Sequence, residues 1–269
     1  MEQYINHITN RNYSKATINI YKKAISDFLE IIKVKSLSEI TVKHIDKYIN
    51  YLSQKKVSAK TMNLYLIAVR NLLSFSGIPL PIKLAKVKDT VIPLITDLQF
   101  EKVCAKASSL RDRAIVELLF ATGVRVHELV AFNKSSIPTL KTENIIPLIG
   151  KGGKLRAVFI SDRARVHVEE YLATRNDENE ALFINKVTKK RLSIRSVQKI
   201  LEKLGAMNGF KLTPHMIRHY FATDILNNGA GLRSLQELLG HSSIITTMKY
   251  THMTNSFLQE EYNKYHNKR

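Results

Sequence analysis

Hydrophobic residues in the first 77 positions recur every three or four residues, which is the spacing of one face of an α-helix. Three segments carry this pattern, and each follows a residue that is able to cap a helix, namely Ser14, Thr41 and Ser58. Gly77 stands where a glycine commonly ends a helix, and Pro79 prevents the helix from continuing. The pattern predicts a helical module over residues 1–77. The positions expected in its core are Tyr21, Ala24, Ile25, Phe28, Ile32, Ile45, Tyr48, Ile49, Leu52, Met62, Tyr65, Val69, Leu72 and Leu73.

The helical pattern stops over residues 78–92. Pro79 and Pro81 exclude a helix, and Lys83, Lys86 and Lys88 favour a strand lying along a polyanion. An ordinary surface connection has a similar composition. We expect a linker at 78–92 and a second domain over residues 93–269.

From Pro93 onward, short helical patterns surround one pair of strands. The helices are predicted over residues 96–107, 112–123, 125–132, 162–175, 193–207, 215–228 and 231–239, with more helix after Ile244. Residues 145–149 and 155–160 are hydrophobic runs joined by a glycine-rich turn, which is typical of a β-hairpin. Pro147 lacks an N–H group and fits only an edge strand. The expected fold is mainly α with a small antiparallel β-sheet, an N-terminal helical domain preceding an α+β domain.

The chain is strongly basic. It has 42 Lys and Arg residues against 23 Asp and Glu residues, and its formal net charge is +19. Residues 1–90 carry 15 basic and 6 acidic side chains, so the excess is not confined to one tail. Such a charge favours nucleic acid as the partner over an anionic membrane, and a basic surface without a polyanionic partner is the alternative.

Other features exclude several classes of protein. The single cysteine, Cys104, excludes a disulfide framework and a cysteine-based zinc site. Arg11, Lys15 and Lys22 precede any long apolar run, so we expect no signal peptide. No apolar stretch reaches the ~18 residues of a membrane span. We therefore expect a cytoplasmic protein with no membrane partner.

A first candidate cluster surrounds Arg125, which follows a helix broken by Gly123 and begins the next helix. At such a place the guanidinium and the backbone N–H groups can converge on an anion. Glu128, three residues later, is placed to hold the guanidinium from behind. An ordinary surface Arg–Glu pair has the same spacing.

A second cluster begins at Pro214, which suits the first turn of a helix. His215 and Arg218 follow on one face, and His219 lies one turn after His215. An imidazole beside a permanent cation suits a phosphate site. His215 and His219 also have the spacing of a zinc pair, but no third ligand accompanies them, and structural histidines are a further alternative.

The third cluster runs from Gly240 and His241 to Tyr250. Nine residues of uninterrupted helix turn by about 900°, which places His241 and Tyr250 on opposite faces. The two side chains can meet only if the segment after Gly240 redirects the chain. A packed tyrosine is the alternative interpretation of Tyr250.

The three clusters, in this order and at these spacings, resemble the tyrosine recombinase (phage integrase) family, and most closely its Xer-type members, over nearly the whole chain. The catalytic residues that this resemblance implies are Arg125, Lys151, His215, Arg218, His241 and Tyr250, with Tyr250 as the nucleophile. Lys151 lies in the glycine-rich turn directly after Ile149 and Gly150, as in the family pattern, and Lys154 is its alternative.

The resemblance implies a site-specific recombinase that cleaves and rejoins double-stranded DNA through a 3′-phosphotyrosyl intermediate, without metal, ATP or another cofactor. It implies a core-binding domain over residues 1–77 and a catalytic domain over 93–269. It also implies a homo-oligomer, with a tetramer in the synaptic complex and a monomer or dimer off DNA. The implied role is chromosome-dimer resolution, or integration and excision of a mobile element. The alternatives are an inactive DNA-binding or architectural protein and a type IB topoisomerase-like enzyme.

Overall fold

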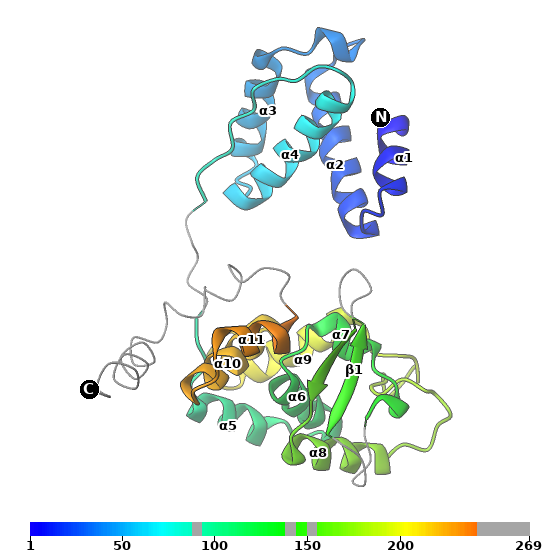
Figure 1. The fold of residues 1–269 in the computed structure, drawn as a ribbon, viewed down its shortest axis with the longest axis vertical. Helices are drawn as coiled ribbons and strands as arrows, with labels where there is room; N and C mark the ends of the chain where they lie inside the picture. Colours follow the sequence, from blue (N-terminus) through cyan, green and yellow to red (C-terminus); the bar gives the residue numbers. More distant parts are fainter. Residues whose placement is uncertain (88–92, 138–143, 150–154, 241–269) are drawn as a thin grey trace, which may run out of the picture. The chain divides into compact units, whose positions relative to one another are not determined.

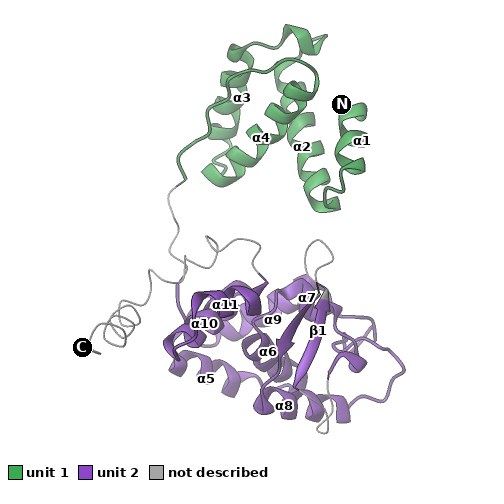
Figure 2. Cartoon of the chain, in the orientation of Figure 1, with its two compact units in different colours: residues 1–90 green, residues 91–269 purple. Residues whose placement is uncertain are grey.

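The computed structural model describes residues 1–87, 93–137, 144–149 and 155–240. The chain divides into two compact units, residues 1–90 and residues 91–269 (Figure 2). The described residues are mostly helical, and the second unit contains a two-stranded antiparallel sheet (Figure 1). This confirms the fold class expected from the sequence.

The first unit is entirely helical in its described part. Its elements are α1 (Glu2–Asn10), α2 (Lys15–Ile32), a 3-10 turn η1 (Leu37–Glu39), α3 (Val42–Gln54) and α4 (Ala59–Phe75). Ser14, Thr41 and Ser58 are the N-caps of α2, α3 and α4, as predicted. Helix α1 was not predicted as a separate element. It packs its Tyr4 and Ile8 into a small core with α2 and α4.

The main core of the first unit forms around Phe28 and Tyr48, whose side chains are fully buried. Their ring centroids lie 5.2 Å apart in an edge-to-face arrangement, and the Tyr48 hydroxyl donates a hydrogen bond to the Ala24 carbonyl oxygen across 3.0 Å. Burial raises the pKa of the Tyr48 phenol well above its ordinary value. The predicted hydrophobic faces of α2 and α3 are therefore the ones that meet in the core.

Residues 78–87 lie on the first unit rather than away from it. Ile82 is buried in the core around Tyr48. The amide of Asn63 donates to the Ala85 carbonyl oxygen at 2.9 Å and accepts from the Ala85 N–H at 2.8 Å. This pair of hydrogen bonds fixes the backbone of the proline-containing segment against α4.

The described part of the second unit contains nine helices and strands and one 3-10 turn. In chain order they are α5 (Asp97–Lys106), α6 (Leu110–Thr122), α7 (Val126–Ala131), the turn η2 (Lys134–Ser136), β1 (Ile145–Ile149), β2 (Leu155–Phe159), α8 (Asp162–Ala173), α9 (Ile194–Ala206), α10 (Pro214–Asn227) and α11 (Leu232–Leu239). These bounds agree with the predicted ones to within about two residues. The largest differences are at the start of α6, which is Leu110 rather than Asp112, and at the end of α8, which is Ala173 rather than Arg175. The helix predicted after Ile244 lies outside the described residues.

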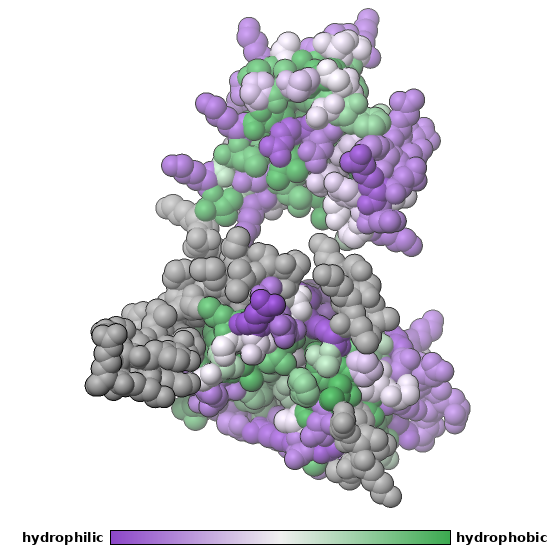
Figure 3. Space-filling view, in the orientation of Figure 1, coloured by the Kyte–Doolittle hydropathy of each residue, from purple (hydrophilic) through white to green (hydrophobic). Residues whose placement is uncertain are grey.

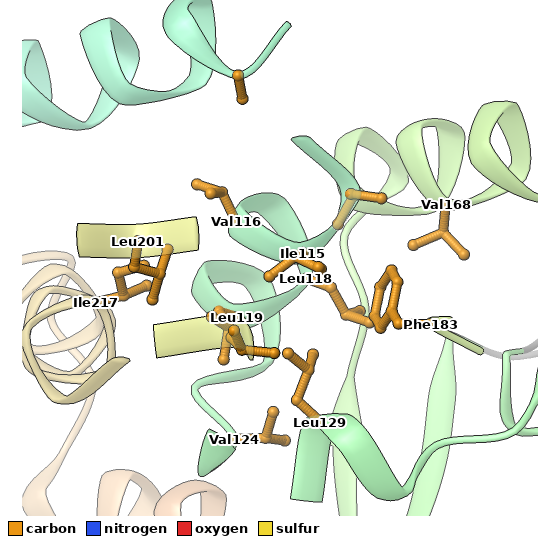
Figure 4. Packing of buried hydrophobic residues seen from close by; sticks show 14 of the residues in the cluster. Ile115, Val116, Leu118, Leu119, Val124, Leu129, Val168, Phe183, Leu201 and Ile217 are labelled. Carbon is orange, nitrogen blue, oxygen red and sulfur yellow. The ribbon is translucent and has the colours of Figure 1, made fainter. Parts of the chain in front are cut away.

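Helix α6 forms the centre of the second unit. It packs against α8 and α10, and against β2 on another side. Ile115, Leu118 and Leu119 of α6 meet Val168 of α8 and Ile217 of α10 in one continuous core (Figure 4). A helix that is hydrophobic on most of its surface is a buried helix, which explains this central position. Arg125, which follows the end of α6, is therefore attached to a helix that the core holds in place.

The sheet pairs β1 and β2 so that Pro147 lies opposite Ala157, and Leu148 lies opposite Arg156. Among the residues that the structure describes, each strand has one neighbour, and Pro147 lies on an edge strand as expected. The Ile160 N–H donates to the Asn144 carbonyl oxygen at 3.0 Å. Because hydrogen-bonded and non-hydrogen-bonded pairs alternate along an antiparallel ladder, Pro147 falls in a non-hydrogen-bonded pair. Its nitrogen points away from β2, and no bond between the strands is lost.

The surface of each unit has hydrophilic side chains projecting from its rim (Figure 3). Within the described ranges, we found no helix with the length and apolar character that crossing a membrane requires.

Candidate active site

Arg125 is positioned by the sharp end of α6. Gly123 ends that helix in the left-handed conformation, with φ +56°, where a side chain is rarely tolerated. Arg125 then forms the N-cap of α7. Glu128 accepts a hydrogen bond from the Arg125 backbone N–H at 2.7 Å and a second from its guanidinium at 3.3 Å. The predicted support of Arg125 by Glu128 is confirmed.

Arg218 lies on α10, which begins at the N-cap Thr213 with Pro214 in its first turn. Its side chain is only 5% exposed. Its guanidinium donates to the carbonyl oxygen of Leu239 at 2.6 Å and to the carbonyl oxygen of Gly123. A buried charge is costly unless hydrogen bonds satisfy it, and these carbonyls do so. Arg218 therefore ties the end of α6 to the end of α11.

The end of α11 brings the two predicted arginines together. Gly240 ends this helix with φ +61°, so the carbonyl groups of its last turn are free to accept other donors. The Arg125 guanidinium lies 3.5 Å from the Gly240 oxygen, next to the Leu239 oxygen that accepts from Arg218. Arg125 and Arg218 thus lie at adjacent carbonyls, immediately before position 241.

Arg156 on β2 is a third arginine of this cluster, and the sequence reasoning missed it. Its guanidinium donates to Glu128 at 2.9 Å and to the Leu239 carbonyl oxygen. Burial lowers the pKa of the Arg156 guanidinium, while the charge of Glu128 raises it. A signal was present in the strand pattern, because Arg156 shares its face with the buried Val158 and Ile160.

His215 lies in the first turn of α10 and is exposed. It borders a cavity of about 450 Å³ whose lining also includes Gln99, Phe210 and Thr213. His219, one turn later, is half-buried. Among the residues that the structure describes, no group of three or more His, Cys, Asp or Glu side chains is arranged to hold a metal ion.

The remaining predicted site residues are Lys151, His241 and Tyr250, together with the alternative Lys154. All four lie outside the described residues, as does the C-terminal segment. The structure describes the residues on either side of them, namely the strands β1 and β2 before and after residues 150–154, and Gly240 before His241.

The described part of the cluster carries more positive than negative charge. The guanidinium groups of Arg125 and Arg156 contact the carboxylate of Glu128, and that of Arg218 shares the Leu239 carbonyl oxygen with Arg156. Glu128 is 5% exposed, so its charge is compensated mainly by the arginines. A cluster with excess forked donors favours an anion with several oxygen atoms, such as a phosphate group.

Helix α9 presents a basic face outside this cluster. Arg195, Lys199 and Lys203 recur every four residues along it, and all three are exposed. Arg195 also forms an ion pair with Glu202 at 3.2 Å. Basic side chains thus form a stripe along one face of the helix.

Each of the two units matches the model of a known protein family. Residues 95–256 match the model of the phage integrase family, and residues 1–75 match the N-terminal SAM-like domain of phage integrases. The chain belongs to the phage integrase family.

Relatives of this phage integrase are tyrosine recombinases. Tyrosine recombinase XerC of Leptospira interrogans and tyrosine recombinase XerA of Pyrococcus horikoshii are each 32% identical to it. Each match covers 98% of this chain and 92% of the relative. Tyrosine recombinase XerD of Oceanobacillus iheyensis is 37% identical over 70% of this chain and 66% of the relative. These matches identify the chain as a tyrosine site-specific recombinase.

Solved structures share the fold. The crystal structure of XerA recombinase is 29% identical, covers 98% of this chain and 97% of its own, and has a TM-score of 0.57. XerH recombinase bound to its difH substrate before cleavage is 23% identical, covers 95% of this chain and 81% of its own, and has a TM-score of 0.74.

Proposed function

We propose that this recombinase cleaves and rejoins double-stranded DNA at a specific site through a covalent 3′-phosphotyrosyl intermediate. Two of its structural neighbours, XerH and lambda integrase, were solved on DNA sites. The net charge of +19 suits the same partner. The observation that carries the proposal is the meeting of Arg125 and Arg218 at the adjacent carbonyls of Leu239 and Gly240.

The two arginines would stabilise the transition state. When a nucleophile adds to a phosphodiester, negative charge grows on the non-bridging oxygens of the phosphorus. Arg125 and Arg218 provide permanent positive charge and forked donors for those oxygens. Because both are held by backbone and carboxylate acceptors, their donors need little reorganisation during the reaction. His241 would add a further donor.

Tyr250 would be the nucleophile. A phenol has an ordinary pKa near 10 and is a weak nucleophile at neutral pH, so it needs a base. His215, an exposed imidazole three residues before Arg218, is the candidate base. The Tyr250 oxygen forms a bond to phosphorus while the bond from phosphorus to the 5′-oxygen breaks, and the phenolic proton passes to His215.

Lys151 would complete the step by giving a proton to the departing 5′-oxygen. Its turn joins β1 to β2, the strand that carries Arg156. The phosphotyrosyl ester keeps the energy of the broken phosphodiester, so a 5′-hydroxyl of either the same or a partner strand can reverse the step. This chemistry needs neither ATP nor a redox change.

We further propose that four copies act together on two DNA sites, and that the free protein is a monomer or dimer. In the cell the reaction would resolve chromosome dimers, or integrate and excise a mobile element. Both units would bind the DNA duplex through its phosphate groups. In α9 the side chains that would do so are Arg195, Lys199 and Lys203.

One experiment tests the chemistry. Mapping covalent protein–DNA adducts across genomic DNA of the host identifies the site, and an oligonucleotide duplex with that site is then used in vitro. We expect the wild-type protein to form an adduct that survives denaturation, and Tyr250→Phe to bind the duplex without forming one. An adduct from Tyr250→Phe would contradict the assignment of the nucleophile.

A second experiment separates the alternative enzymes. Supercoiled plasmids carry two copies of the mapped site or lack it. We expect resolution that depends on the site. Relaxation independent of the site would indicate a topoisomerase, and binding without reaction would indicate an inactive DNA-binding protein. The position of the mapped site, in the host chromosome or at the ends of a mobile element, distinguishes the two roles.

A further inference from the structure

Arg156 occupies a central place in the hydrogen-bond network around the two catalytic arginines. One arm of its guanidinium donates to Glu128, the carboxylate that holds Arg125. The other arm donates to the carbonyl oxygen of Leu239, which also accepts from Arg218. One side chain therefore connects the support of Arg125 to the support of Arg218.

We infer that Arg156 is a positioning residue for the recombination chemistry, holding Glu128 and the end of α11 so that Arg125 and Arg218 keep a fixed spacing. This inference rests on the proposed function. Arg156 would not touch the DNA phosphate itself, since its two arms are occupied by protein acceptors.

The charges of the network support this role. The Oε2 atom of Glu128 accepts both the Arg125 backbone N–H at 2.7 Å and the Arg156 guanidinium at 2.9 Å. Without Arg156, the buried carboxylate would be left with Arg125 alone, and would draw its guanidinium toward the protein. The side chain of Arg125, now 31% exposed, would then be less available to a phosphate.

The lack of a side chain at Gly240 also supports the positioning role of Arg156. A Cβ atom at this position would overlap the Arg156 guanidinium. Two features therefore require a glycine at position 240. One is its left-handed φ of +61°, and the other is the close approach of Arg156 to the end of α11. A methyl group at 240 would displace Arg156 without removing any of its functional atoms.

The place of Arg156 in the chain adds to the argument. It lies on β2, five positions after Lys151, and β2 contacts α11. A shift of the strand relative to α11 would therefore be transmitted to both the turn at 150–154 and the segment after Gly240. Fixing these parts matters because a displacement of about 1 Å in a catalytic group can slow a reaction by ~10²-fold.

The test measures single-turnover cleavage of the mapped duplex at saturating protein, where the rate constant and the amplitude are obtained separately. We expect Arg156→Gln to lower the cleavage rate constant about 10- to 100-fold, with DNA affinity and amplitude retained. Arg156→Lys keeps the charge but not the fork, and should recover part of the rate. Arg163→Gln is the matched control, because Arg163 also pairs with a buried carboxylate, Glu117, in the same unit. It should lower stability and leave the rate constant unchanged.

A pair of glycine variants provides an independent test that leaves Arg156 in place. Gly240→Ala introduces both backbone strain and the overlap with Arg156. Gly229→Ala introduces the strain alone, because φ is +87° there and no atom lies within 4 Å of the added Cβ. We expect only Gly240→Ala to slow cleavage as the Arg156 variants do.

The outcomes distinguish the inference from the function on which it rests. Unchanged rate constants in the Arg156 variants would overturn the inference and leave the proposed function standing. Reduced amplitude with an unchanged rate constant would also overturn it, because that result means a merely structural role. Failure of the wild-type protein to form an adduct would overturn the proposed function, and the inference with it.

Discussion

The guanidinium of Arg218 and the carbonyl oxygen of Leu239 are joined by a 2.6 Å hydrogen bond between α10 and the last turn of α11. Because Arg218 also bonds the carbonyl of Gly123, this one side chain connects three parts of the chain that lie far apart in the sequence. Arg218 therefore has a structural role beside its proposed catalytic one, and the two can be separated by experiment.

Substitution of Arg218 by lysine keeps a positive charge and removes the fork that bonds Gly123 and Leu239. We expect the free energy of unfolding to fall by about 1.5–3 kcal/mol, the range for hydrogen bonds of a charged group. The cleavage rate constant should fall by ~10²–10³, the loss typical of one transition-state donor. Urea unfolding and single-turnover cleavage measure the two effects.

Arg175→Lys is the control for this variant. Arg175 has a side chain that is only 5% exposed and bonds the carbonyl oxygens of Asn179, Ala181 and Leu182. A similar loss of stability with an unchanged cleavage rate is expected. If both variants slow cleavage to the same degree, the effect of Arg218 is one of stability alone.

Gly123→Ala should destabilise the second unit strongly. Its φ of +56° disfavours any residue with a side chain, and a Cβ there would overlap the ring of Phe221, which is buried. Backbone strain and overpacking together should cost about 2–4 kcal/mol. Gly209→Ala has a φ of +78° and nothing within 4 Å, so it should cost about 1–2 kcal/mol. Equal losses in urea unfolding would contradict the overlap with Phe221.

The proposed role of Lys151 predicts a chemical rescue. Lys151→Ala should cleave an ordinary duplex about 10²-fold or more slowly, because the 5′-oxygen must leave without a proton. A duplex with sulfur in place of the bridging 5′-oxygen has a leaving group that needs no proton, and should restore cleavage. Absence of rescue, with DNA binding retained, would point to Lys154 or to a structural role of Lys151.

Asp224 predicts a pH dependence of stability. Burial and the nearby Asp97 raise the pKa of the Asp224 carboxyl, while a hydrogen bond from Asn228 lowers it. As pH rises, the unfolded chain loses this proton first, so the contribution of Asp224 to stability is lost between its ordinary pKa and its raised one.

Asp224→Asn should therefore be more stable than the wild type at pH 7, and the difference should shrink as the pH falls from the raised pKa of Asp224 toward the ordinary aspartate pKa near 4. Urea unfolding of both proteins at several pH values measures this difference. A gain of the same size at every pH would mean that the carboxylate charge is not its cause.

Removal of residues 256–269 tests the proposed assembly. We expect the shortened protein to bind a duplex with one half-site as tightly as the full chain, and to form fewer complexes that join two sites. Native gel electrophoresis and light scattering distinguish the two kinds of complex. Undiminished joining of sites would contradict a role of this segment between copies.

Much of the fold could be predicted because capping residues mark where helices begin. Ser14 and Ser58 accept backbone hydrogen bonds at the starts of α2 and α4, and both starts were predicted. The two misjudged starts lack such a signal. The N-cap of α1 is Met1, and the Ser109 side chain makes no capping bond at α6. At these two starts no side-chain cap bond marks the first turn, and the hydrophobic pattern alone did not indicate it.

The site was predictable where its contacts are local. Arg125 and Glu128 lie three residues apart, so helical spacing alone indicated their pairing. The bond from Arg156 to Leu239 joins positions 83 residues apart, and the bond from Arg218 to Gly123 joins positions 95 apart. Such contacts depend on how α6, α10, α11 and the sheet pack, which no local pattern specifies.

The orientation of Pro147 has a consequence for association between copies. A strand with a free edge offers N–H and C=O groups on which another chain can add a strand. Because the nitrogen of Pro147 points away from β2, the outer edge of β1 lacks a donor at its middle residue. Pro147 removes no hydrogen bond between β1 and β2, but it would remove one between β1 and a third strand added at its outer edge. The proline therefore opposes the edge-to-edge joining of sheets from two copies, which is a first step of aggregation.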